Sequence, residues 1–355
     1  MDKPIADQDK LNKLFGRIMS DISGALGLLI GYMGDQLGLY RALADGGDMT
    51  SEQLATATGL NERSVREWLA ANATAHYIEY DPDAGTFSMT PEQTVVFAGE
   101  GHPQCAQGLF QNILSVMADE PKVTEAYRTG KGVPWSDRNP CLFCGTERFL
   151  RPYYAMSLTK SWIPALDGMT ERLEAGGNVA DIGCGHGSST ILMAKSYPNS
   201  TFYGFDYHGP SIEHARERAK EAGVDGNTVF ETVTAKDFPG HDYDLVTIFD
   251  AIHDMGDPVG AAAHVRSLLK DDGVFMVVEP YSKDSLEDNM TLMGRIMYAS
   301  SATVCTQASL AQEVGLALGA QAGPKRLTEM LNEAGFSRVR FVAETVSNIV
   351  LEARA

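Results

Sequence analysis

The sequence predicts an α/β protein: a seven-stranded, doubly wound sheet with six parallel strands and one antiparallel strand, preceded by an N-terminal, mostly helical winged-helix domain. In the second half of the chain, short segments with strand character alternate with helical segments, which is typical of such a sheet. Between residues 50 and 90, two short helical segments precede a hairpin pattern. The predicted strands are Val179–Asp181, Thr201–Asp206, Thr228–Val233, Tyr243–Asp250, Gly273–Glu279, Arg338–Glu344 and Asn348–Arg354.

The last two predicted strands are separated only by residues 345–347. A crossover between parallel strands needs about a dozen residues or more, so these two strands must pair antiparallel. The sheet is therefore expected to end in one hairpin.

Residues 50–90 fit two capped helices followed by a hairpin. Thr50 can cap the first helix together with Gln53, Asn61 can cap the second, and the letters DPDAG suit the hairpin turn. This order is a winged helix-turn-helix, a module that often reads DNA. Because the charges in residues 62–67 (ERSVRE) cancel, we do not expect this helix to bind nucleic acid.

Composition supports a soluble protein of two domains or more. The chain has 355 residues, of which 44% are hydrophobic, and its net charge of -18 repels phosphate backbones and anionic membranes. Five cysteines and no signal-peptide pattern indicate reduced thiols and a cytoplasmic location. The apolar run Ile22–Met33 is shorter than the roughly 20 residues of a membrane span, so no membrane contact is expected.

A stripe of glycines accompanies this apolar run, at intervals of three and four residues that place them on one helical face. Glycine lowers helix stability by roughly 1 kcal/mol relative to alanine, so something must pack closely on the stripe. The neighbour is either the rest of the domain or a second subunit, and we expect a homodimer. The stripe consists of Gly24, Gly27, Gly31, Gly34 and Gly38.

A glycine-rich turn follows the first predicted strand of the sheet, in the stretch VADIGCGHGSST. Its glycines, Gly183, Gly185 and Gly187, leave the backbone open to a ligand at the start of a helix. The dinucleotide fingerprint would place its third glycine one residue later, so this loop predicts a different nucleoside ligand.

Three features together resemble the S-adenosylmethionine-dependent methyltransferases of the Rossmann-like class. They are the Asp-x-Gly-x-Gly-x-Gly motif at 181–187, Asp206 in YGFDYH at the end of the second strand, and the terminal hairpin. With the winged helix and the phrase GTERFLRPYYAMSLTKSWIPALDG, the whole chain is similar to bacterial two-domain methyltransferases of that class. The resemblance implies S-adenosyl-L-methionine as cofactor and a small-molecule methyl acceptor.

The same resemblance assigns the cofactor-binding residues. A carboxylate at a strand end can accept both ribose hydroxyls, which suits Asp206, and Tyr207 would lie against the adenine. Gly183 and Gly185 would admit the amino-acid end of the cofactor. Asp181 would either order the loop or contact the ammonium through water.

Three further residues complete that set. Asp237 and Phe238 would contact the edge and the face of the adenine, although Asp237 also suits a plain surface turn. Asp250 follows the fourth strand and is assigned to the cofactor site as well.

The stretch FDAIHDMGDP carries the candidate base. Small-molecule O-methyltransferases of plants and animals have their catalytic histidine in a matching His-Asp pair, which implies that His253 is the base and that Glu279 orients it. An unperturbed pKa near 6.5 would make His253 a neutral base above about pH 7. The alternative is a solvated histidine that caps the next helix.

The sequence also departs from the plant pattern, which places a second acid before the last helix where AGPKRL has Pro324 and Lys325. Cys141 and Cys144 form a C-x-x-C without a second pair, so we expect ordinary thiols and no metal. A long insert, residues 281–323, carries Met290, Met293 and Met297 on one helical face, as an apolar acceptor pocket or as core.

These observations predict three regions: a winged-helix and dimerisation domain at 1–100, a helical linker at 101–160, and a cofactor-binding methyltransferase domain at 161–355. The predicted function is methylation of a small molecule, at oxygen rather than at sulfur or nitrogen. The alternative is a winged-helix transcriptional regulator that senses S-adenosylmethionine.

Overall fold

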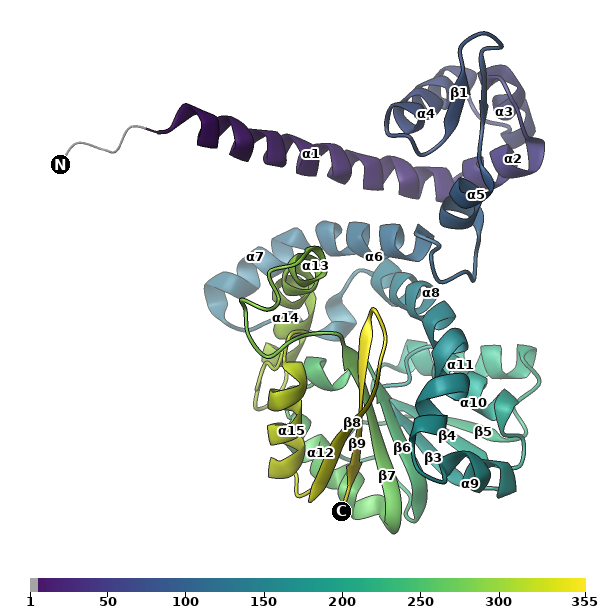
Figure 1. The fold of residues 1–355 in the computed structure, drawn as a ribbon. Helices are drawn as coiled ribbons and strands as arrows, with labels where there is room; N and C mark the ends of the chain where they lie inside the picture. Colours follow the sequence, from purple (N-terminus) through teal and green to yellow (C-terminus); the bar gives the residue numbers. More distant parts are fainter. Residues whose placement is uncertain (1–5) are drawn as a thin grey trace, which may run out of the picture. The chain divides into compact units, whose positions relative to one another are not determined.

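The computed structural model describes residues 6–355 (Figure 1). The chain forms two compact units, one of residues 1–114 with 144–149 and one of residues 115–143 with 150–355. The predicted linker, 101–160, is therefore not a separate region, because both units share its residues.

The first unit contains the predicted winged helix. Thr50 and Gln53 form a reciprocal capping box, and Asn61 caps the following helix by accepting from the backbone N–H of Ser64. Strands β1 and β2 pair antiparallel, as the hairpin pattern predicts. The elements are α1 (Gln8–Gln36), α2 (Leu39–Gly46), α3 (Ser51–Thr58), α4 (Glu62–Thr74), β1 (Glu79–Asp81), β2 (Thr86–Ser88), α5 (Pro91–Ala98) and α6 (Gln107–Ala118), whose last residues belong to the second unit.

The glycine stripe lies on α1 for part of its predicted length only. Gly31 and Gly34 are buried, and a Cβ atom on them would come within 2.7 Å of the Phe110 ring and 2.5 Å of the Trp68 ring. A Cβ on Gly24 would meet nothing within 4 Å. Gly38 lies beyond the helix, where it precedes α2 with a φ of 68°. Packing inside the domain therefore accounts for the two glycines nearest the end of α1.

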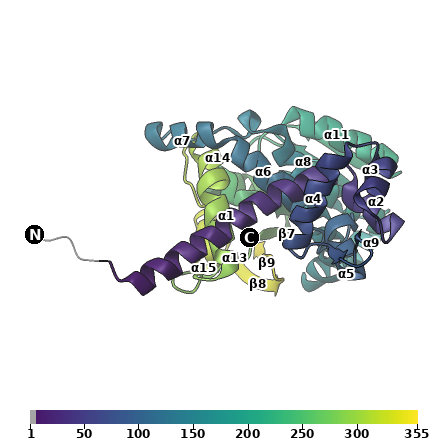
Figure 2. The ribbon, with the colours of Figure 1, turned by 90° about the horizontal axis from the view of Figure 1, so that it is seen from above.

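The rest of α1 is an apolar helix that its own domain leaves uncovered. Figures 1 and 2 both show it running away from α2–α5 as one rod. By length and composition alone it could cross a membrane, a test that soluble core helices and N-terminal signal sequences also pass. Its exposed apolar residues are Leu11, Leu14, Phe15, Ile18, Met19, Ile22, Leu26, Leu29 and Met33.

The second unit is built around the predicted sheet, in the order β5-β4-β3-β6-β7-β9-β8. Neighbouring strands from β5 to β7 are parallel, while β9 pairs antiparallel with both β7 and β8. Six strands thus run one way and one runs against them, which confirms the predicted fold class. The strands are β3 (Asn178–Ile182), β4 (Thr201–Asp206), β5 (Thr228–Thr232), β6 (Tyr243–Phe249), β7 (Leu269–Pro280), β8 (Arg338–Glu344) and β9 (Asn348–Arg354).

Helices cover both faces of this sheet and form a core on each. Along β3, Val179 packs into the core with α9–α11, and Ala180 packs into the opposite core with α12 and α15. This alternation follows the two-residue period of a strand. The helices are α7 (Glu120–Thr129), α8 (Pro140–Ser157), α9 (Met169–Ala175), α10 (Ser188–Ser196), α11 (Gly209–Glu221), α12 (Pro258–Leu268) and α15 (Gly323–Glu333).

The insert after β7 forms α13 (Leu292–Ser300), a π-helical turn (Ser301–Cys305) and α14 (Thr306–Leu310). The predicted methionine face is not core, and its role in an acceptor pocket stays a prediction. Met290 precedes α13 and is 80% exposed, and Met293 is exposed as well. The π-helical turn and α14 both contribute buried residues to the insert.

The packing of α1 generates a stability prediction. Gly34→Ala should lower the free energy of unfolding by about 1–3 kcal/mol, because the new Cβ atom forces the rings of Trp68 and Tyr40 to move. Gly24→Ala is the matched control, since it adds helix propensity in open space and should stabilise the protein slightly. Urea-induced unfolding of the full-length variants measures both, and an unchanged midpoint for Gly34→Ala would contradict this packing.

Candidate active site

The glycine-rich loop lies between β3 and α10, at the carboxyl edge of the parallel strands. Gly183, Gly185 and Gly187 all have φ values in the left-handed region, at 68°, 52° and 75°. A side chain on Gly187 would collide with Ala215 and Phe230, whereas Gly185 faces open space. The loop therefore needs glycine to form, and at Gly185 it leaves the backbone accessible to a ligand.

Asp181 orders this loop from beneath. Its buried carboxylate accepts hydrogen bonds from Ser189 and Thr190 at 2.6 Å each and from Thr247 at 3.1 Å. Burial raises the pKa of Asp181 to about 6, against the effect of the three hydroxyl donors. Of the two predicted roles, the structure thus favours loop ordering over contact with a cofactor ammonium.

Asp206 stands at the carboxyl end of β4, facing the glycine loop. Its Oδ2 accepts from the backbone N–H of Gly185 at 2.9 Å, and its Oδ1 accepts from that of His208 at 2.8 Å. These two bonds fix the carboxylate, and burial raises its pKa above the ordinary value. The next residue, Tyr207, remains 47% exposed. The structure therefore brings together the predicted ribose-binding acid and the glycine loop.

The two residues predicted at the adenine behave differently. Phe238 is buried in the core, where its ring packs against Phe205, Tyr243 and His264. The prediction that Phe238 presents its face to the adenine was therefore wrong. Asp237 accepts a hydrogen bond from Thr234, three residues earlier, and forms the surface turn that was its alternative.

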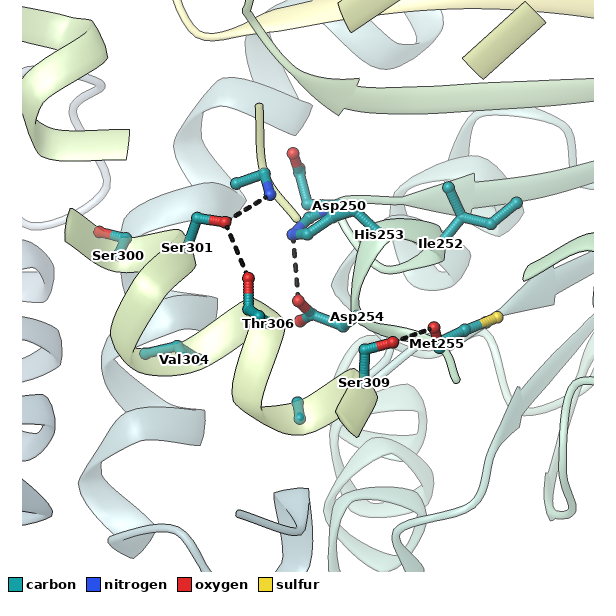
Figure 3. A network of polar contacts seen from close by, with 12 residues as sticks. Asp250, Ile252, His253, Asp254, Met255, Ser300, Ser301, Val304, Thr306 and Ser309 are labelled. Atoms are coloured by element: carbon teal, nitrogen blue, oxygen red, sulfur yellow. Dashed lines mark hydrogen bonds and ion pairs between the residues drawn. The ribbon is translucent and has the colours of Figure 1, made fainter. Parts of the chain in front are cut away.

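His253 lies in a short 3-10 turn after β6 and is only 3% exposed. Its Nδ1 donates to Oε2 of Glu279, at the end of β7, across 2.5 Å. On the other side of the ring, Nε2 lies 3.2 Å from Oδ1 of Asp254 in an ion-pair contact without hydrogen-bond geometry (Figure 3). The next helix is capped by Asp257, so His253 is not a solvated helix cap.

The two carboxylates change the acid–base character of His253. Burial alone would lower its pKa, but Glu279 and Asp254 outweigh burial and raise the pKa well above 6.5. The expectation of a neutral imidazole from pH 7 upward was therefore wrong. The two acids on either side of the ring thus favour its protonated, imidazolium form.

Asp250 connects this histidine to the glycine loop. Its Oδ2 accepts from the Tyr154 hydroxyl at 2.9 Å and its Oδ1 from the Asn348 amide at 2.7 Å, while its neighbour Ala251 packs on Gly183. Burial raises the pKa of Asp250 to about 7, and its φ of 49° is unusual for a residue other than glycine. Contact between Asp250 and the cofactor stays a prediction.

The π-helical turn brings a thiol to the same place. The donor atoms of His253, Asp254 and Cys305 lie within 4.8 Å of one another, close enough to hold a metal ion. Burial raises the pKa of the Cys305 thiol to about 11, so the group is protonated at neutral pH. The buried guanidinium of Arg138 interacts electrostatically with both Asp254 and Cys305.

Sequence reasoning missed four residues of this region: Tyr154, Arg138, Cys305 and Asn348. Tyr154 stands in the phrase FLRPYYAMS, which was used as a family signature without a role for its side chains. Asn348 opens the last strand beside the end of β7, and the predicted hairpin, which pairs only the last two strands, did not indicate this neighbour. Arg138 and Cys305 reach the site through the fold of the insert, and no periodicity in the sequence indicates that.

Comparison with known proteins agrees with this geometry. Residues 173–335 match a family model described as a methyltransferase domain, and residues 24–98 match one described as an Rv2258c-like winged HTH domain. A curated relative, 27-O-demethylrifamycin SV methyltransferase from Amycolatopsis mediterranei, is 32% identical over 103 residues. That alignment covers 28% of this chain, and the chain spans only 38% of the relative's length.

Solved structures resemble the whole chain. The mitomycin 7-O-methyltransferase MmcR has a TM-score of 0.72 at 17% identity, over 98% of this chain and 100% of that chain. Human N-acetylserotonin methyltransferase, solved in complex with S-adenosylmethionine, has a TM-score of 0.71 at 15% identity, over 100% of both chains. Residues 173–335 thus match a methyltransferase domain and residues 24–98 a winged HTH domain, and the whole chain has the fold of two-domain methyltransferases.

Proposed function

We propose that this methyltransferase methylates a hydroxyl oxygen of a small molecule, with His253 as the residue that faces the reacting oxygen. The observation that carries the proposal is the imidazole fixed between Glu279 and Asp254, at the same sheet edge as the glycine loop. S- or N-methylation would have less use for such a group, because a thiol ionises near pH 8.5 and a neutral amine attacks through its lone pair without prior loss of a proton. A methyl-transfer screen across phenols, thiols and amines, read by mass spectrometry, tests the proposal.

When bound, S-adenosylmethionine supplies a methyl group on a sulfonium, an activated carbon open to in-line displacement. The residues present suit it: Gly185 leaves its backbone open, and the Asp206 carboxylate is fixed at the strand end. Asp181 and Asp250 hold the surrounding segments by accepting hydrogen bonds, Asp181 from the Ser189 hydroxyl and Asp250 from the Asn348 amide.

The protonated state of His253 defines its role in this proposal. An imidazolium that donates from Nε2 stabilises the acceptor oxygen as an oxyanion, which is the nucleophile. An imidazolium with an oxyanion carries the same number of protons as a neutral imidazole with a hydroxyl, so the two descriptions share one transition state. Glu279 keeps the ring in place through Nδ1, and Asp254 holds Nε2 until the acceptor oxygen approaches.

The winged helix is not proposed to bind DNA. On α4, Arg63 pairs with Glu67 at 2.5 Å and Arg66 pairs with Glu62 at 2.6 Å. Both arginines that a recognition helix would offer to phosphates are therefore matched by acids on the same helix, in a chain with a net charge of -18.

A homodimer formed through α1 is part of the proposal. The helix exposes a continuous apolar stripe with alternating spacings of three and four residues, from Leu11 through Phe15, Ile18 and Ile22. Such a stripe is the seam by which two helices pack side by side. A second copy of α1 or of its surroundings would cover it, in a protein expected to act in the cytoplasm without a membrane.

The first functional prediction concerns the cofactor. Asp206→Asn should weaken S-adenosylmethionine binding at least tenfold, because a charge-assisted hydrogen bond contributes about 1.5–3 kcal/mol. Titration calorimetry measures this. Asp237→Asn is the control, since Asp237 forms a surface turn and its loss should change affinity less than twofold. If the Asp206 variant and the wild type bind S-adenosylmethionine with equal affinity, Asp206 does not bind the ribose.

The second concerns the histidine. His253→Asn should lower the rate of methyl transfer to a hydroxyl acceptor by about 10²- to 10⁴-fold, the usual contribution of a positioned proton-transfer group. Cofactor affinity should stay close to that of the wild type. Single-turnover kinetics separates chemistry from binding, and a variant that keeps more than a tenth of the wild-type rate would make His253 structural.

The pH profile checks the imidazolium state. With the pKa of His253 raised well above 6.5, one proton must leave the complex before reaction, so kcat/KM should still rise between pH 7 and 8. Asp254→Asn removes one of the acids that raise this pKa, and the rising limb should then end at lower pH. A wild-type plateau that begins near pH 6.5 would contradict the raised pKa.

The third concerns assembly. Replacing Phe15 and Ile18 together by Glu should convert a dimer into a monomer, because four charges would be buried across the paired stripe. Analytical ultracentrifugation gives the mass, with Lys13→Glu on the same helix as the control. A monomeric wild type at micromolar concentration, or wild-type protein that co-sediments with phosphatidylcholine vesicles, would overturn the dimer.

A further inference from the structure

Arg138 carries a buried guanidinium with unused donors. The side chain is 3% exposed and lies between the short turn at 135–137 and α8. Its Nη2 donates to the carbonyl oxygens of Thr303 and Val304 at 2.9 and 3.2 Å. Its Nε and Nη1 have no hydrogen-bond partner among residues 6–355. Buried donors of a charged group are normally paired, so these N–H groups indicate a missing acceptor.

The two nearest acids do not supply that acceptor. Burial lowers the pKa of Arg138, and the charges of Asp119 and Asp254 oppose this shift. The carboxylate of Asp119, however, is occupied by Lys122 at 2.7 Å and by the backbone N–H of Asn139 at 2.8 Å. Asp254 forms an ion pair with His253, and its Oδ1 makes no hydrogen bond to Arg138 or to any other described residue. The guanidinium therefore lies in an acidic neighbourhood without a carboxylate of its own.

The position of Arg138 relates it to the proposed reaction. The carbonyl groups that it contacts belong to the π-helical turn Ser301–Cys305, and the thiol of Cys305 in that turn contacts His253. In Figure 3 the same turn packs beside the loop of His253 and Asp254, and Ser309 of the following helix bonds to the carbonyl of Met255. Arg138 thus contacts the same π-helical turn whose thiol lies beside His253.

We propose that Arg138 binds a carboxylate of the methyl acceptor, so that the natural substrate is a hydroxy acid. The inference rests on the proposed function and adds the substrate class. A guanidinium pairs with a carboxylate through charge-assisted hydrogen bonds, and in a buried site these bonds discriminate strongly against a neutral analogue. His253 faces the hydroxyl that is methylated, and Arg138 holds the acid group that orients it.

The test measures binding rather than turnover. Full-length protein saturated with S-adenosylhomocysteine is titrated by calorimetry with aromatic and aliphatic hydroxy acids, each paired with its neutral amide. We expect at least one hydroxy acid to bind ten or more times tighter than its amide. If no acid in the panel exceeds its amide, the proposal is overturned without any variant.

Two substitutions then assign the preference to Arg138. Arg138→Gln should abolish the preference of acid over amide, because it removes the charge and keeps a donor for the carbonyls of the π-helical turn. Arg138→Lys should retain part of it. Arg128→Gln, an exposed arginine paired with Glu125, is the matched control and should change nothing. A full preference in Arg138→Gln would place the carboxylate elsewhere.

The outcome is separable from that of the proposed function. Affinity for S-adenosylhomocysteine and the urea midpoint show that each variant is folded. An intact preference for acids together with an active His253→Asn variant would disprove the role of the histidine and leave Arg138 standing. If no hydroxy acid is preferred over its amide and the His253→Asn variant is inactive, the role of Arg138 is disproved and that of the histidine stands.

Discussion

A carboxylate buried at the end of β3 is the anchor on which the ligand-binding edge depends. Asp181 bonds to two hydroxyls in the first turn of α10 and to one on β6, and so ties the glycine loop, its helix and the neighbouring strand together. Gly183 and Gly187 must adopt left-handed backbone there, which only glycine does at low cost. With the loop fixed, Asp206 bonds to Gly185 and is aimed at the same space.

The second half of the site is a balance of charges. Glu279 and Asp254 both lie against His253, and the buried guanidinium of Arg138 has no carboxylate of its own there. AGPKRL offers no acid at positions 324 and 325, and the second carboxylate beside this histidine is Asp254, directly after it in sequence. The insert completes the arrangement, because its π-helical turn offers Cys305 to His253 and two carbonyl groups to Arg138.

Most of the fold could be predicted from the sequence, since it depends on local and periodic signals. Strand alternation, the capping box at Thr50 and the short link before Asn348 each determine their element without tertiary information. The pairing of His253 with Glu279 was predictable because the ends of parallel strands share an edge. The protonation of His253 was not, because it depends on how closely Asp254 and Glu279 approach a buried ring. The prediction for Phe238 was wrong for a similar reason. The sequence pattern gives the position of the ring along the chain, but not that the core covers its faces.

The two surfaces that this chain leaves unpaired differ in chemistry, and the difference indicates what each one needs. On α1 the exposed groups are apolar and extend over many turns. The free energy gained by covering them is roughly proportional to the apolar area removed from water, so a long partner surface is needed. At Arg138 the unpaired groups are a few buried N–H donors, so the gain comes from one small, charged ligand with the correct geometry. In the proposals made above, a macromolecular partner therefore covers α1 and a small acid pairs with Arg138.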